Sequence, residues 1–70
     1  MADICVTGCG SYRVESLSEE GADWMWDNVV EAEEEESGGV MVAYLDSAIY
    51  TQDIMDGATE EGLEVWDRRV

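Results

Sequence analysis

The hydrophobic residues of the chain form four short runs with the patterning of β-strands. Residues 4–7 and 12–17 flank the turn sequence Gly8-Cys9-Gly10-Ser11, which predicts a β-hairpin. The alternative for residues 4–7 is a frayed terminus, so this strand is optional in the predicted order. Residues 40–45 are apolar without a break, which predicts a central strand buried on both faces. Residues 63–68 alternate well enough to form the last strand.

Between these runs, two stretches repeat apolar residues with helical spacing. The first predicts a helix over residues 19–31, with Ser18 as its N-cap. Its apolar positions follow the i, i+3, i+4, i+7 rule, and they are Ala22, Met25, Trp26 and Val29. This count places Trp26 in the core. Trp24 lies about 160° away around the helix and is expected on a flank or in solvent.

The second helix is predicted over residues 48–61, capped by Asp46 or Ser47 and ended by Gly62. Its apolar stripe consists of Tyr50, Ile54, Gly57 and Ala58, with Met55 at the edge. The resulting order is β-(β)-α-β-α-β. We therefore expect a single α+β domain over residues 1–70, a small sandwich of two helices packed on a three- or four-stranded sheet.

The segment between the first helix and the central strand is dominated by glutamate. Four consecutive glutamates at positions 33–36 oppose the dipole at the end of the first helix, which favours cations there. We therefore expect an acidic mobile loop over residues 32–39.

The charge of the chain is extreme for its size. Eighteen Asp and Glu residues face three Arg, with no Lys and no His, so the net charge is −15. Such a charge excludes direct binding of nucleic acid and attracts strongly basic surfaces, above all those that hold nucleic-acid phosphates. Neither a signal peptide nor an apolar run long enough to span a membrane is evident, so we expect a cytoplasmic protein that does not bind membranes.

On both predicted helices, the carboxylates fall in rows. Residues three or four apart on a helix are about 5–6 Å apart, a repeat that resembles a phosphate backbone. The alternative is an acidic helix face that is merely solvated. The two rows consist of Glu20, Asp23, Asp27 and Glu31 on the first helix and of Asp53, Asp56 and Glu60 on the second.

Other chemistry finds little support in the sequence. Cys5 and Cys9 lack the further ligands of a structural zinc site, and we expect two reduced thiols or a local disulfide. No EF-hand spacing, catalytic histidine or phosphate loop is present. We therefore expect no enzyme, no cofactor and no dedicated metal site.

From about Tyr12 to Val65, the chain resembles short uncharacterised proteins carried by phages and plasmids. The resemblance is carried by the helix opening Leu17-Ser18-Glu19-Glu20, the apolar strand and the ending Gly62-Leu63-Glu64-Val65. It implies that Trp24, rather than Trp26, points inward. The orientation of the two tryptophans therefore stays open.

In size, acidity and expected compartment, the chain is also similar to the DNA-mimic inhibitors of mobile elements, the anti-CRISPR and anti-restriction proteins. This resemblance implies a non-enzymatic inhibitor that acts in the host bacterial cell. It would block the basic DNA-binding surface of a defence complex, with a CRISPR–Cas effector as the favoured target because anti-restriction mimics tend to be longer. The alternatives are an anti-restriction protein and a small acidic interaction or regulatory module without mimicry.

The residues expected to contact such a partner are the helix carboxylates, the glutamate run and one tryptophan as an exposed anchor. They are Glu20, Asp23, Trp24, Asp27, Glu31, Glu33, Glu34, Glu35, Glu36, Asp53, Asp56 and Glu60. The sequence leaves open the identity of the target and the oligomeric state. It also does not show whether the two acidic helix faces are contiguous.

Overall fold

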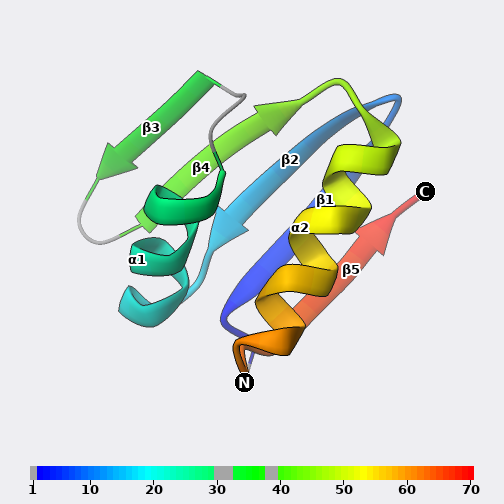
Figure 1. Ribbon diagram of the computed structural model, residues 1–70. Coiled ribbons are helices and arrows are strands. Elements are labelled where there is room, and N and C mark those ends of the chain that lie inside the picture. The colour runs from blue at the N-terminus through cyan, green and yellow to red at the C-terminus, as the bar shows by residue number, and fades with distance from the viewer. Residues whose placement is uncertain (1, 30–32, 38–39) are drawn as a thin grey trace.

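The computed structural model describes residues 2–29, 33–37 and 40–70 and shows an α+β fold, with two helices packed on one mixed sheet (Figure 1). The elements in chain order are β1 (Ile4–Cys9), β2 (Ser11–Ser16), α1 (Glu19–Asn28), β3 (Glu33–Ser37), β4 (Val40–Leu45), α2 (Ala48–Glu60) and β5 (Val65–Arg69). This confirms the expected α+β class and the order of the predicted elements; β3 is an additional strand, so the sheet has five strands rather than three or four.

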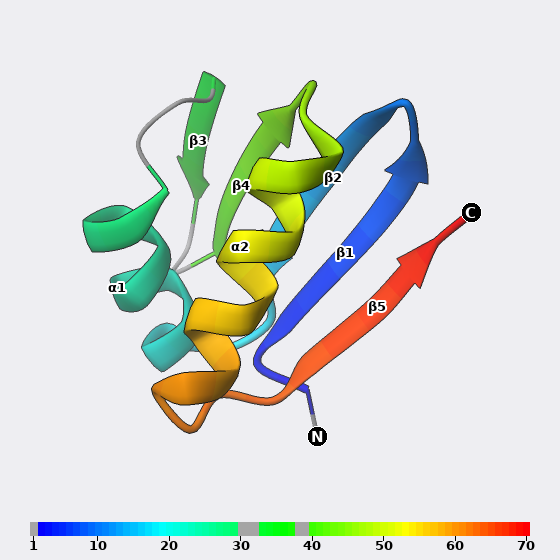
Figure 2. The same ribbon diagram turned by 45° about the vertical axis from the view of Figure 1, so that its right-hand side comes forward.

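The sheet has the strand order β3-β4-β2-β1-β5. β5 pairs in parallel with β1, and the other neighbouring pairs are antiparallel. β2 is therefore parallel to β3, and β4 is parallel to β5, so α1 and α2 each lie in a crossover between parallel strands. The two crossovers start from antiparallel strands and run in opposite directions across the sheet. Because such crossovers are right-handed, both helices must cover the same face, as Figure 2 shows.

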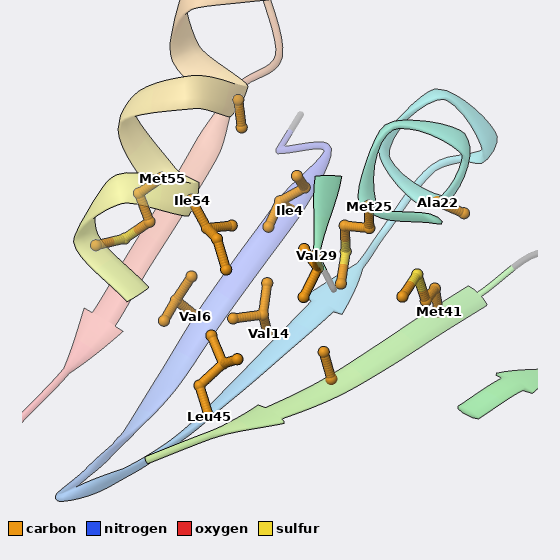
Figure 3. Close-up of a cluster of buried hydrophobic side chains, with 12 residues drawn as sticks. Ile4, Val6, Val14, Ala22, Met25, Val29, Met41, Leu45, Ile54 and Met55 are labelled. Carbon is orange, nitrogen blue, oxygen red and sulfur yellow. The ribbon is translucent and has the colours of Figure 1, made fainter. Parts of the chain in front are cut away.

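The hydrophobic core lies between that face and the helices (Figure 3). β1, β2 and β4 supply the alternate residues of the covered face, and the helices supply one stripe each. A core this small has room for few large side chains, and three of its members are alanine or valine residues on the strands. The core consists of Ile4, Val6, Val14, Ala22, Met25, Val29, Met41, Ala43, Leu45, Ile54, Met55 and Ala58.

Asp3 joins the start of β1 to both α1 and β5. Its backbone N–H donates to the carbonyl of Glu64 at 2.8 Å, and its backbone carbonyl accepts from Leu17 at 2.6 Å. Its carboxylate accepts hydrogen bonds from the hydroxyl of Ser18 at 2.7 Å and from the N–H of Glu64 at 3.0 Å. Two segments that are 61 positions apart are thereby fixed to each other.

Two expectations about the sheet are wrong. Within the loop expected over residues 32–39, Glu33–Ser37 instead forms β3, which pairs with β4 from Glu33 opposite Tyr44 to Ser37 opposite Val40. Pairing satisfies backbone groups of β4 that would otherwise form an open edge. Residues 32, 38 and 39 lie outside the described part of the chain. The mobility of the segment stays a prediction.

β4 is also not buried on both faces. Its residues alternate between buried and exposed or half-buried positions, and Tyr44 is 47% exposed. The unbroken apolar run predicted burial on both faces of the strand, but both crossover helices cover the same face of the sheet. The other face of β4 therefore stays uncovered.

α1 ends earlier than expected, at Asn28 rather than near residue 31. Val29 caps the helix in an extended conformation and is 1% exposed, so leaving the helix lets this side chain join the core. The counting of apolar residues also placed the wrong tryptophan inside. Trp24 is half-buried against the core, whereas Trp26 is 43% exposed.

Candidate functional site

α1 carries its carboxylates on the side that faces away from the sheet. Ser18 caps the helix by accepting the N–H of Gly21 at 3.0 Å, and Gly21, Ala22 and Met25 form the buried stripe. At 100° per residue, the centre of the exposed carboxylates lies about 180° from the centre of this stripe. These carboxylates are Glu19, Glu20, Asp23 and Asp27.

α2 has the same arrangement. The hydroxyl of Ser47 accepts the N–H of Tyr50 at 3.1 Å, which fixes the start of the helix. Its buried stripe comprises Thr51, Ile54, Met55 and Ala58, and an exposed row lies opposite. This row consists of Asp53, Asp56 and Glu60.

The two rows lie on neighbouring helices and point to the same side. Trp24 of α1 lies against Gly57 of α2, where an added Cβ would come 3.2 Å from the ring. Figures 1 and 2 show both helices on the same side of the sheet, so their outer faces lie on the same side of the molecule. We call these two faces together the acidic helical layer, which comprises Glu19, Glu20, Asp23, Asp27, Asp53, Asp56 and Glu60.

The arginines lie on the strands rather than on the helices. Arg13 pairs with Glu15 at 3.0 Å on β2, and Arg69 pairs with Asp67 at 3.1 Å on β5. The hydrogen bond from Arg69 is the main reason that the pKa of Asp67 is lowered. Neither of these ion pairs involves a carboxylate of the acidic helical layer.

At one edge of the acidic helical layer, the side chain of Gln52 links Asp56 to Arg69 through hydrogen bonds. Gln52 donates to the carboxylate of Asp56 at 3.0 Å and accepts a hydrogen bond from the guanidinium of Arg69 at 2.7 Å. Asp67 is the main cause of the raised pKa of Arg69, and Asp56 contributes to it. Arg69 therefore marks the border of the layer on the side of β5.

The structure places six of the expected contact residues, Glu20, Asp23, Asp27, Asp53, Asp56 and Glu60, on the outward sides of two neighbouring helices, so both acidic faces lie on one side of the molecule. Glu31 lies outside the described residues. Glu33, Glu34, Glu35 and Glu36 belong to β3, next to the strand β4 on which α1 packs. Trp24 is half-buried against Gly57, so its expected role as an exposed anchor is not supported.

Two exposed apolar side chains near the layer were missed by the sequence analysis. Ile49 on α2 is 79% exposed, and Trp26 on α1 is 43% exposed. Ile49 precedes Asp53, Asp56 and Glu60 by four, seven and eleven positions, so it shares their helix face. That spacing was the available signal for an apolar contact inside the acidic row.

Within residues 2–29, 33–37 and 40–70, no three Asp, Glu or Cys side chains are grouped so that they could hold a metal ion. Over the same residues, neither helix is long and apolar enough to cross a membrane. Cys5 is half-buried and Cys9 is exposed, and both are free thiols.

Comparisons of the chain with protein-family models, with curated proteins and with solved structures found no match.

Proposed function

We propose that the acidic helical layer binds the basic surface of a nucleic-acid-binding protein and excludes the nucleic acid from it. The observation that carries the proposal is the alignment of two carboxylate rows on one side of the molecule, while the arginines lie on the strands. A protein that is acidic only for solubility has no need to separate its charges in this way.

The spacing of the carboxylates suits a surface built for phosphates. Within a row, neighbouring carboxylates are about 5–6 Å apart. The rows are separated by about one interhelical distance, 8–10 Å, which is comparable to the groove widths of B-DNA, about 6–12 Å. A basic channel shaped for two phosphate strands therefore meets two lines of negative charge.

The partner that we favour is the DNA-binding channel of a CRISPR–Cas effector in the bacterial cytoplasm, with inhibition by occupancy and without catalysis. A restriction enzyme with a similar channel is the second target to test. Ile49 and Trp26 supply apolar contacts beside the carboxylates, and such contacts contribute affinity that salt does not screen.

The proposal is tested by competition. Labelled target DNA is bound to a purified guide-loaded effector, and its displacement by the protein is followed by fluorescence anisotropy. The double variant Asp53→Asn with Glu60→Gln should weaken displacement about tenfold, which corresponds to about 1.4 kcal/mol. Its unfolding midpoint should stay equal or rise, because like-charge repulsion is relieved.

The matched control is Asp46→Asn with Glu61→Gln, which removes the same charge from exposed residues outside the layer. It should displace DNA like the wild type. An equal loss in both double variants would show that net charge alone acts. Absence of displacement from effectors and restriction enzymes, even at low salt, would favour a regulatory module without mimicry.

A further inference from the structure

β5 is an outer strand of the sheet, so within the described part of the chain only one of its edges has a neighbouring strand. That edge pairs in parallel with β1. At the start of the pair, the N–H of Ile4 donates to the carbonyl of Glu64 at 3.1 Å. At the other end, the N–H of Val70 donates to the carbonyl of Gly8 at 3.0 Å. Even-numbered residues therefore bond to β1, and the backbone N–H and C=O groups of the odd-numbered residues of β5 point to the outer edge.

A carboxylate already occupies one of these outward N–H groups. The N–H of Arg69 donates to Oδ1 of Asp67, two residues earlier on the same strand, at 3.1 Å. A strand that added to β5 would need this N–H for one of its own carbonyl oxygens. The incoming carbonyl oxygen would instead meet the negative charge of the carboxylate.

The side chain of Arg69 holds this carboxylate in place. Its Nε donates to Oδ1 of Asp67 and its Nη2 donates to Oδ2, both at 3.1 Å, so the contact is two-pronged. Arg69 is itself fixed from the covered side of the sheet, because Nη2 donates to Gln52 of α2 at 2.7 Å and the guanidinium lies 6.0 Å from the centre of the Tyr12 ring. The Arg69 side chain is also the main reason that the pKa of Asp67 is lowered, so the carboxylate stays charged at neutral pH.

We propose that Asp67 and Arg69 close the outer edge of β5 to the addition of another strand, and we call this pair the edge guard. Asp67 lies opposite Val6, whose side chain is buried in the core, so both members of the edge guard lie on the covered face of the sheet. Charged residues that point inward on an outer strand are one of the means by which proteins prevent sheets from joining edge to edge.

The edge guard also opposes pairing of β5 with the β5 of a second copy. In an antiparallel pair centred on residue 67, each Asp67 would lie opposite the Asp67 of the other copy, and like charges directly opposite each other destabilise a sheet. The remaining positions of the same register favour pairing, because Trp66 of each copy would lie opposite Arg68 of the other. Removing the two carboxylates should therefore allow this pairing.

The test compares variants of the full chain by sedimentation in reducing buffer with about 0.5 M NaCl, which screens the repulsion between acidic copies. The wild type should sediment as a monomer of 7.8 kDa. Asp67→Ala should form a dimer of twice this mass, with a dissociation constant at least tenfold below that of the wild type. Glu61→Ala is the matched control, since it removes one charge from an exposed residue at the end of α2, and it should stay monomeric.

Asp67→Pro separates pairing at the edge from the loss of a charge. It also removes the carboxylate, but proline offers no N–H at the outer edge and is tolerated on edge strands. This variant should therefore stay monomeric. Hydrogen exchange locates the contact in the Asp67→Ala dimer. The outward amides of residues 67 and 69 should exchange more slowly than in the monomer, whereas those of Trp66 and Arg68, which face β1, should not change.

Circular dichroism and urea unfolding report whether each variant is folded, and Asp67→Thr replaces Asp67→Ala if the alanine variant is unfolded. A folded Asp67→Ala chain that stays monomeric overturns the proposal. A dimer formed equally well by Asp67→Pro or by Glu61→Ala overturns it too, as does a wild-type dimer with slowed exchange at the outward amides of β5.

Discussion

The hydroxyl of Ser16 accepts a hydrogen bond from the backbone N–H of Met41 at 2.5 Å, and both residues are fully buried. The backbone pairing of β2 with β4 runs from Tyr12 opposite Leu45 to Glu15 opposite Val42. The hydroxyl therefore continues the connection between the two strands at the point where the ladder ends. A buried N–H of β4 depends on this one side chain.

Replacing Ser16 with Ala should destabilise the protein by about 1–3 kcal/mol, because the N–H of Met41 would be left buried without an acceptor. The measurement is the free energy of unfolding in urea. Ser11→Ala is the control, since that hydroxyl donates to Asp46 at 3.3 Å on the exposed surface. It should cost less than about 0.5 kcal/mol. Equal losses in the two variants would contradict a special role for Ser16.

Gly21 should tolerate no side chain, although it lies in a helix. A Cβ there would come 2.6 Å from the backbone carbonyl oxygen of Asp3. We expect Gly21→Ala to cost about 1–3 kcal/mol through overpacking, in spite of the better helix propensity of alanine.

Gly57→Ala is the comparison for Gly21→Ala. Its Cβ would come 3.2 Å from the Trp24 ring, a side chain that can shift, rather than from backbone. It should change the unfolding free energy by less than about 1 kcal/mol in either direction. If Gly21→Ala proved as stable as Gly57→Ala in urea unfolding, the close packing of Gly21 against the backbone carbonyl of Asp3 would be wrong.

Lowering the pH should reduce the stability that the Asp3 carboxylate contributes through its hydrogen bonds with Ser18 and Glu64. The pKa of its carboxyl is lowered from 3.8, mainly by the hydrogen bond from Ser18 and next by that from the N–H of Glu64. A lowered folded pKa means that the ionised group stabilises the folded state above pH 3.8. This contribution is lost as the pH falls through the folded pKa. The stability difference between wild type and Asp3→Asn should therefore be larger at pH 7 than at about pH 3.

Urea unfolding at both pH values measures this difference. Ser18→Ala removes the main cause of the lowered pKa, so in that background Asp3→Asn should show a weaker dependence on pH. Ser18→Ala also removes the N-cap of α1. That loss is the same at both pH values, so it does not change how the stability difference between Asp3 and its Asn variant depends on pH. A stability difference between wild type and Asp3→Asn that stayed constant with pH would show that the ionised carboxylate of Asp3 does not stabilise the folded state.

Local signals predicted most of the fold. Ser18 and Ser47 cap the two helices as expected, and Gly62, with φ +86°, follows the end of α2. β3 could not be predicted, because a run of glutamates has little strand propensity and the strand depends on the edge of β4. The tryptophans were misplaced because Gly21 is part of the buried face of α1, and counting apolar side chains overlooks a glycine.

The candidate site was predictable in its parts but not as a whole. The spacing of Asp53, Asp56 and Glu60 was enough to place them on one side of a helix. That this side adjoins the row on α1 follows from the two crossovers, which depend on a strand order that local sequence does not encode. The uncovered face of the sheet has the same origin, since both helices had to lie on the other face.

The parallel pairing of β1 with β5 also constrains how the protein is made. Ile4 lies opposite Val65, so one edge of β1 has no partner until almost the whole sequence has left the ribosome. Pairings this distant in sequence form slowly, and an open strand edge invites pairing with other chains. The strong negative charge of the nascent chain keeps such chains apart during that interval. The same excess of carboxylates that costs the finished fold some stability would thus protect its assembly.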